Sequence, residues 1–194
     1  MIDKKSFASM REQVERFDRL REDVIKLSRD ILKLSKGAIY SVHRNEIKTA
    51  KQQLADAKSV IKKIDSLIAK DVHLAAVGPY LEALEEYVEA SCYLSFVVEK
   101  KIPMPKELGV DVDTYLPGLC DLIGEITRKA VNDSIKGDYQ SAIHIRDIVS
   151  EIYAEFMLFD FRNIPVRRKF DSMKYSLEKL ENLILELKLK GKLQ

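Results

Sequence analysis

Apolar residues recur along the first forty positions with the alternating spacing of three and four that is typical of one face of an α-helix. The pattern runs without a break and predicts one helix over about 6–44. At 1.5 Å per residue this helix would be roughly 58 Å long. The residues that the spacing places inward are Phe17, Leu20, Val24, Leu27, Ile31, Leu34 and Ala38.

The rest of the chain shows the same periodicity in five further segments. Only 7 glycines and 5 prolines interrupt the 194 residues, which favours long helices over many short strands. We therefore predict an all-α fold, a six- to seven-helix bundle formed by a single domain over 1–194. The five predicted helices span about 46–70, 79–101, 114–136, 138–161 and 165–191.

Proline, glycine and aspartate mark the predicted helix ends. Pro103 and Pro105 cannot continue the hydrogen-bond ladder of the third helix, so they predict a loop that extends to Asp113. Asp113 is the predicted N-cap of the fourth helix, and Gly137 is its predicted C-cap. Asp138 is then the predicted N-cap of the fifth helix.

The composition excludes several classes of protein. With 46% hydrophobic and 33% charged residues the chain is too apolar for disorder, and no apolar run approaches the ~18 residues of a membrane span. The first residues lack the apolar core of a secretory signal, so we expect a cytoplasmic protein with no membrane partner. Cys92 and Cys120 have no metal-site spacing, and we interpret both as small core residues.

The charge is unevenly distributed along the chain, although the formal total is only +2. Residues 1–70 carry 17 basic and 10 acidic side chains, residues 71–125 carry 3 and 11, and residues 126–194 carry 13 and 10. Four basic residues of the first helix share one face, which is either a solvated surface or a stripe that follows a phosphate backbone. They are Lys26, Arg29, Lys33 and Lys36.

Two predicted helices carry clustered carboxylates. At 100° per residue Glu82, Glu86 and Glu89 lie within about 60° of one another on the third helix. Asp121 and Glu125 lie one turn apart on the fourth helix. Both faces could simply be solvated, but if they meet across a groove, a divalent cation or a shared proton must lie between them.

The ligand types restrict the metal that such a site could hold. Carboxylates without histidine or thiolate suit Mg²⁺ or Mn²⁺, and the chain contains no Glu-x-x-His motif of a helical di-iron site. A metal held by acids near a basic stripe is typical of phosphodiester or pyrophosphate hydrolysis.

Several short motifs occur in a fixed order along the chain and together span nearly every predicted helix. They are Lys26-Leu-Ser-Arg-Asp-Ile31, His43-Arg44, Glu86-Tyr-Val-Glu89-Ala, Asp113-x-Tyr115-Leu-x-Gly118, Asp121-Leu-x-Gly124-Glu125, Gly137-Asp138-Tyr139 and Lys169-Phe-Asp171. No single motif is specific, but in this order they resemble the translin family, and those of the first two-thirds resemble its Trax-type subunits most.

The resemblance implies a function as well as a fold. It implies an all-α subunit of a hollow, octamer-like homo-oligomer that binds single-stranded or duplex-like RNA, and single-stranded DNA. It further implies a Mg²⁺- or Mn²⁺-dependent endoribonuclease whose catalytic and metal-holding residues are Glu86, Glu89, Asp121 and Glu125. The residues that we nominate for nucleic-acid contact are Arg29, Lys33, Lys36 and Arg44.

Two other functions remain open at this point. The chain could be a non-catalytic, translin-like protein that binds single-stranded RNA or DNA. It could also be an all-α nucleotide pyrophosphatase, but those enzymes typically carry Glu-x-x-Glu followed by Glu-x-x-Asp. The spacing Asp121-x-x-x-Glu125 does not fit that second element.

Overall fold

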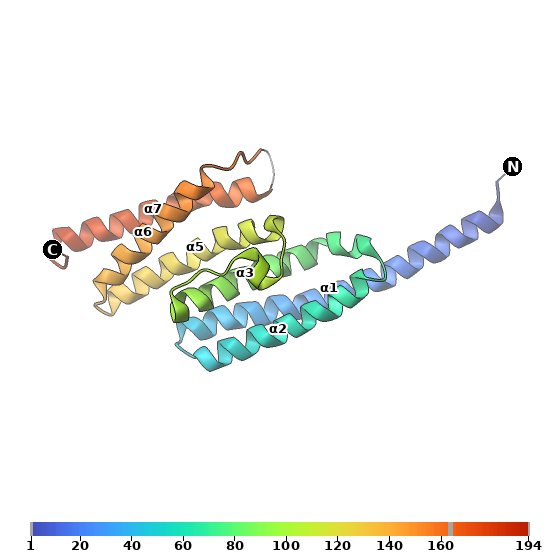
Figure 1. The fold of residues 1–194 in the computed structure, drawn as a ribbon, viewed down its shortest axis with the longest axis horizontal. Helices are drawn as coiled ribbons and strands as arrows, with labels where there is room; N and C mark the ends of the chain where they lie inside the picture. The colour runs from blue at the N-terminus through green and yellow to red at the C-terminus, as the bar shows by residue number, and fades with distance from the viewer. Residues whose placement is uncertain (1, 163–164, 194) are drawn as a thin grey trace. The chain divides into compact units, whose positions relative to one another are not determined.

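The computed structural model describes residues 2–162 and 165–193. Within those ranges every regular element is helical, which confirms the predicted all-α fold (Figure 1). In the same ranges no helix is long and apolar enough to cross a membrane. The elements are α1 (Lys4–His43), α2 (Ile47–Ile68), the 3₁₀-helix η1 (Val72–Ala76), α3 (Gly78–Glu99), α4 (Pro105–Leu108), α5 (Val112–Ile135), α6 (Tyr139–Phe156) and α7 (Pro165–Leu189).

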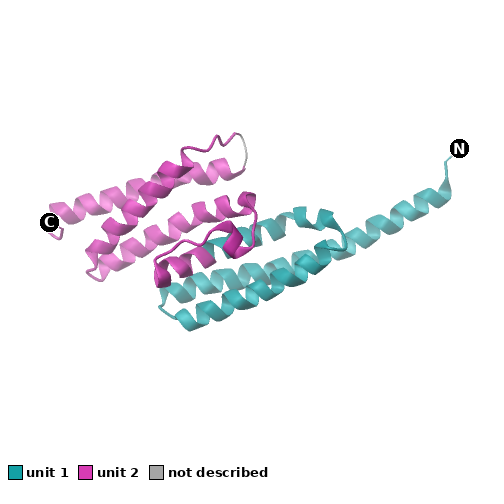
Figure 2. Ribbon diagram, in the orientation of Figure 1, with its two compact units in different colours: residues 1–90 teal, residues 91–194 magenta. Residues whose placement is uncertain are grey.

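The chain divides into two compact units, Met1–Ala90 and Ser91–Gln194 (Figure 2). The boundary lies inside α3, so one continuous helix contributes residues to both units. The single domain expected from the sequence stays a prediction.

In the first unit, α1 packs along α2 (Figure 1). The buried positions of α1 follow the predicted spacing, but Ser28 and Ser35 are fully buried while Leu27 and Leu34 are only half-buried. The two helices approach each other closely at Gly37 of α1. A Cβ atom added to Gly37 would lie 2.7 Å from Nε2 of Gln53 on α2.

The first half of α1 has no such packing within this unit. No described residue before Val24 is buried, and Phe7, Met10 and Val14 are 49–60% exposed. Helix α1 has 40 residues and α2 has 22, so α1 is about 27 Å longer than α2.

In the second unit, α5, α6 and α7 pack against one another. The prediction that α6 continues to residue 161 is wrong, because it ends at Phe156. Phe159 and Phe161 stack at 5.2 Å, and Phe161 also lies 5.6 Å from Phe170 of α7. In a continued helix Phe161 would point about 160° away from Phe159, so the chain turns after Phe156 to bring both rings together.

The cap of α5 differs from the prediction. Asp111, and not Asp113, is the N-cap, since its side chain accepts a hydrogen bond from the Thr114 amide at 2.7 Å. The cap of α6 is confirmed, because the Asp138 carboxylate accepts from the Ser141 amide at 3.2 Å. Gly137, between these two helices, has φ +93° and follows the cap residue of α5 as glycine commonly does.

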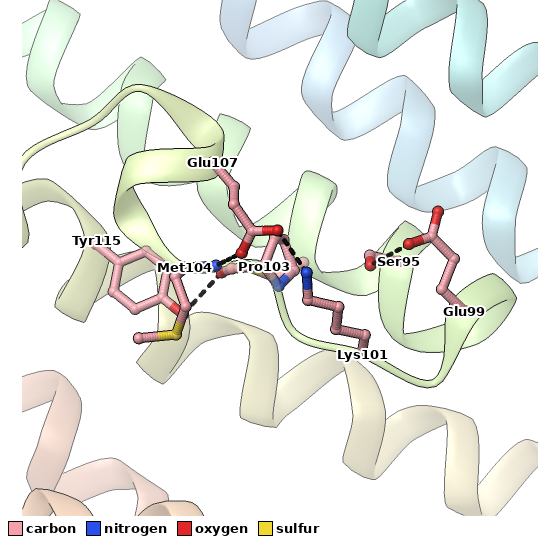
Figure 3. Close-up of polar contacts among 8 residues, drawn as sticks. Ser95, Glu99, Lys101, Pro103, Met104, Glu107 and Tyr115 are labelled. Carbon is pink, nitrogen blue, oxygen red and sulfur yellow. Dashed lines mark hydrogen bonds and ion pairs between the residues drawn. The ribbon is translucent and has the colours of Figure 1, made fainter.

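A short, well-bonded connection joins α3 to α5, and it contains a helical turn, α4, that the sequence analysis missed (Figure 3). The Glu107 carboxylate accepts hydrogen bonds from the Met104 amide at 2.7 Å and from Nζ of Lys101 at 2.5 Å. The Tyr115 hydroxyl of α5 donates to the Pro103 carbonyl at 3.0 Å. One turn is too short to produce a periodic signal, which is why the sequence predicted only a loop.

Candidate metal and nucleic-acid site

The carboxylate pair of α3, Glu86 and Glu89, lies in the first unit and is largely shielded from solvent. Glu89 is only 8% exposed, within a stretch in which Tyr87 to Ala90 are all buried, and the Glu86 side chain is 18% exposed. Glu82 of the predicted acidic face remains exposed. Poorly hydrated carboxylates attract cations more strongly than solvated ones, so the environment separates this pair from an ordinary acidic surface.

Glu86 is also connected to the predicted phosphate-binding face of α1. Nζ of Lys36 lies 3.9 Å from Oε2 of Glu86. The basic stripe and the acidic pair, which the sequence analysis treated as separate features, are therefore adjacent in this unit.

The carboxylate pair of α5, Asp121 and Glu125, lies in the second unit and is partly accessible. The Asp121 side chain is 36% exposed and that of Glu125 is 22% exposed. Oδ2 of Asp121 lies 2.5 Å from Nζ of Lys169 on α7, and Oε2 of Glu125 lies 3.8 Å from Nη1 of Arg128. Gly124, beside Glu125, is exposed, and a Cβ atom there would have no neighbour within 4 Å. The surface next to this pair is thus open to a ligand.

The chemistry of these donors fits a hard divalent cation. Within the described ranges no three His, Cys, Asp or Glu side chains lie close enough together to hold a metal ion. Magnesium, however, usually takes only one or two protein carboxylates and completes its shell with water and substrate phosphate. Each pair alone therefore has a suitable donor set, while the shared site of all four residues stays a prediction.

The four residues nominated for nucleic-acid contact differ in their surroundings. Arg29, Lys33 and Lys36 are exposed on α1. Arg44 forms two bonds with Glu46, at 2.9 and 3.0 Å, and these raise the pKa of Arg44 and lower that of Glu46. Glu46 thus occupies the guanidinium fork of Arg44 that a phosphate would otherwise use.

Two residues near the α5 pair were not predicted from the sequence to belong to the site. Lys169 is 48 positions from Asp121, so no local spacing could have revealed their contact. Tyr93 is 1% exposed, and its pKa is raised first by burial and next by the charge of Glu125. Its phenol therefore stays protonated beside that carboxylate.

The two cysteines lie in the core of the protein. Cys92 is 0% exposed and Cys120 is 4% exposed, which confirms their interpretation as core residues. Burial raises the pKa of the Cys92 thiol to about 12, so this thiol is neutral near pH 7.

The long packed helices define an all-α helical-bundle protein. A sequence profile described as the Translin family matches residues 19–191, and the chain belongs to that family.

Individual relatives match shorter stretches. Translin of Homo sapiens is 33% identical over 86 residues, which are 44% of this chain and 38% of that protein. Translin-associated protein X of Rattus norvegicus is 31% identical over 78 residues, which are 40% of this chain and 27% of that protein. The matched stretch thus spans well under half the length of these curated relatives.

Solved structures match nearly the whole chain. Apo-NeC3PO superposes with a TM-score of 0.85 at 28% identity, over 95% of this chain and 97% of that one. A complex of AfC3PO with duplex RNA superposes with a TM-score of 0.84 at 22% identity, over 95% of this chain and 97% of that one. These similarities confirm the translin-type fold.

Proposed function

We propose that this chain is a Trax-like, metal-dependent endoribonuclease that binds and cleaves single-stranded RNA as a homo-oligomer. Its membership of the translin family supports RNA as the substrate class. A solved complex of duplex RNA with AfC3PO, a protein of the same fold, supports it as well. The observation that carries the proposal is the contact between Lys36 and Glu86. It places a residue of the basic face of α1 next to an acidic pair.

The proposed roles follow from the charge and exposure of each group. Arg29, Lys33 and Lys36 bind the phosphate backbone, because they are exposed cations on one helix face. Arg44 joins them when it leaves Glu46 for a phosphate.

The carboxylates of Glu86, Glu89, Asp121 and Glu125 hold Mg²⁺ or Mn²⁺. A bound divalent ion would polarise a phosphoryl oxygen and lower the pKa of a bound water. The open surface beside Gly124 gives the scissile phosphate access to Asp121 and Glu125.

The experiment that tests this proposal is cleavage of a labelled single-stranded RNA, with Mg²⁺ or Mn²⁺ and with EDTA. Glu125→Gln keeps the size of the side chain and removes its charge, so it should abolish cleavage while filter-binding affinity stays intact. Glu82→Gln is the matched control, since Glu82 is an exposed acid outside both pairs. Undiminished cleavage by Glu125→Gln would exclude the assignment.

A second function, non-catalytic binding of single-stranded RNA or DNA, is favoured by the ion pairs at the acidic residues taken together. Lys36 lies within 4 Å of Glu86, Arg128 within 4 Å of Glu125 and Lys169 within 4 Å of Asp121, so these carboxylates have basic neighbours even without metal. Under this alternative the purified protein binds RNA with a steep salt dependence and never cuts it, with Mg²⁺ or Mn²⁺ present.

The homo-oligomer is proposed for a physical reason as well. Phe7, Met10 and Val14 are exposed on the part of α1 that is unpacked within its unit, and apolar surface of this kind is commonly covered by a partner. We propose an octamer-like shell in the cytoplasm. Light scattering that gives a monodisperse particle of 22.3 kDa would contradict the assembly.

A further inference from the structure

Asp121 of the α5 acidic pair forms a short ion pair with Lys169 of α7. Nζ of Lys169 lies 2.5 Å from Oδ2 of Asp121, and the two residues belong to the packed helices α5 and α7. Their side chains are 33% and 36% exposed, so the pair lies at the edge of the helix packing and solvent reaches it.

The position of Lys169 is set by the packing of α7. Val166, Phe170 and Met173 are all at least nine-tenths buried and follow the spacing of one helix face. They fix the rotation of α7, and with it the side of the helix from which Lys169 extends.

The neighbouring Arg167 is engaged elsewhere. Its Nε lies 2.9 Å from Oδ1 of Asp171, and its guanidinium lies 5.6 Å from the ring centroid of Phe170. Arg167 is thus bonded within α7, while Lys169 places its charge on Asp121.

We infer that Lys169 is a built-in counter-ion that competes with the divalent cation for Asp121. The inference rests on the proposed function, since it takes Asp121 as a metal ligand. An ammonium group and a divalent cation cannot both lie against Oδ2 without strong repulsion. When the metal binds, Nζ must therefore leave, and the flexible lysine stem lets it swing into solvent.

The competition lowers the affinity of the site for the metal ion by an amount that can be measured. A half-exposed lysine–carboxylate pair is worth at most about 1 kcal/mol, which corresponds to about a fivefold change in affinity. Lys169 therefore keeps Asp121 neutralised without metal and weakens metal binding by that modest factor. Lys169 thereby helps to set the metal concentration at which the site is half occupied.

The test is direct titration of the full-length protein with Mn²⁺ in the absence of RNA, with free Mn²⁺ followed by its electron paramagnetic resonance signal. Lys169→Gln should bind Mn²⁺ more tightly than the unmodified chain, by a factor of up to about five. Lys169→Arg, which keeps the cation, should restore the original affinity. Lys174→Gln is the matched control, because it removes an exposed lysine from the same helix and should leave the affinity unchanged.

A fourth variant separates this inference from the proposed function. Asp121→Asn should weaken Mn²⁺ binding. If it does, and Lys169→Gln binds no more tightly than the unmodified chain or than Lys174→Gln, the competition is refuted and the metal site stands. If Asp121→Asn binds Mn²⁺ unchanged, Asp121 is not a ligand, and both the inference and this part of the proposed site are refuted.

Discussion

Cys92 should make the folded protein lose stability as the pH rises above 9. Its side chain is fully buried in α3, and burial raises the pKa of the thiol from 9.0 to about 12. The physical cause is that a thiolate at this position would lose its hydration.

The sign of the effect follows from the two protonation states. Below pH 9 the thiol is protonated in both the folded and the unfolded chain, so it contributes no pH dependence. Between pH 9 and 12 the unfolded chain releases this proton while the folded chain keeps it, and stability falls as the pH rises. At pH 10, one unit above the unfolded pKa, the loss is about 1.4 kcal/mol. This value depends mainly on the unfolded pKa, because the folded thiol is still protonated.

Urea unfolding of the unmodified chain and of Cys92→Ala, at pH 7 and pH 10, checks this prediction. The pKa values of Tyr93 and Tyr115 are also raised, in each case first by burial, and both tyrosines are present in both proteins. The charge of Cys92 adds to the shift of Tyr115, but the folded Cys92 thiol is neutral at pH 10, so the contributions of the two tyrosines cancel. The difference in free energy of unfolding between the two proteins should shrink by about 1.4 kcal/mol from pH 7 to pH 10. A difference that stays constant would refute the reasoning.

Two further predictions concern helix ends. Asp111→Ala should lower the free energy of unfolding by about 1 kcal/mol because the Thr114 amide loses its acceptor, whereas Asp113→Ala should cost about 0.5 kcal/mol at most. Equal losses in thermal unfolding of the two variants would reject Asp111 as the cap. Lys100 has φ +56°, so Lys100→Gly should raise the free energy of unfolding by about 1 kcal/mol, and a loss in urea titrations would contradict this.

The sequence alone predicted the long helices closely. The predicted start and end of α1, α2 and α3 lie within two residues of those observed, because the face that each helix buries imposes its period on the sequence. The end of α6 was not predictable in this way, since it depends on contacts between Phe161 and Phe170 of the next helix.

Helix caps were only partly predictable. Asp111 and Asp113 are both good N-cap residues and lie two positions apart, so propensity could not choose between them. In the structure the cap is Asp111. It lies at the end of the connection from α3, where the Tyr115 hydroxyl donates a hydrogen bond to the Pro103 carbonyl.

The sequence by itself determined the order of the helices and the basic face of α1, and it nominated the four carboxylates of the proposed site. Only the tertiary structure decided that Glu89 is buried. It also decided that Lys36 pairs with Glu86, and that Lys169 pairs with Asp121. Contacts of this kind depend on how one helix is rotated against another. That rotation is set by side-chain packing between distant segments, and spacing along a single helix does not encode it.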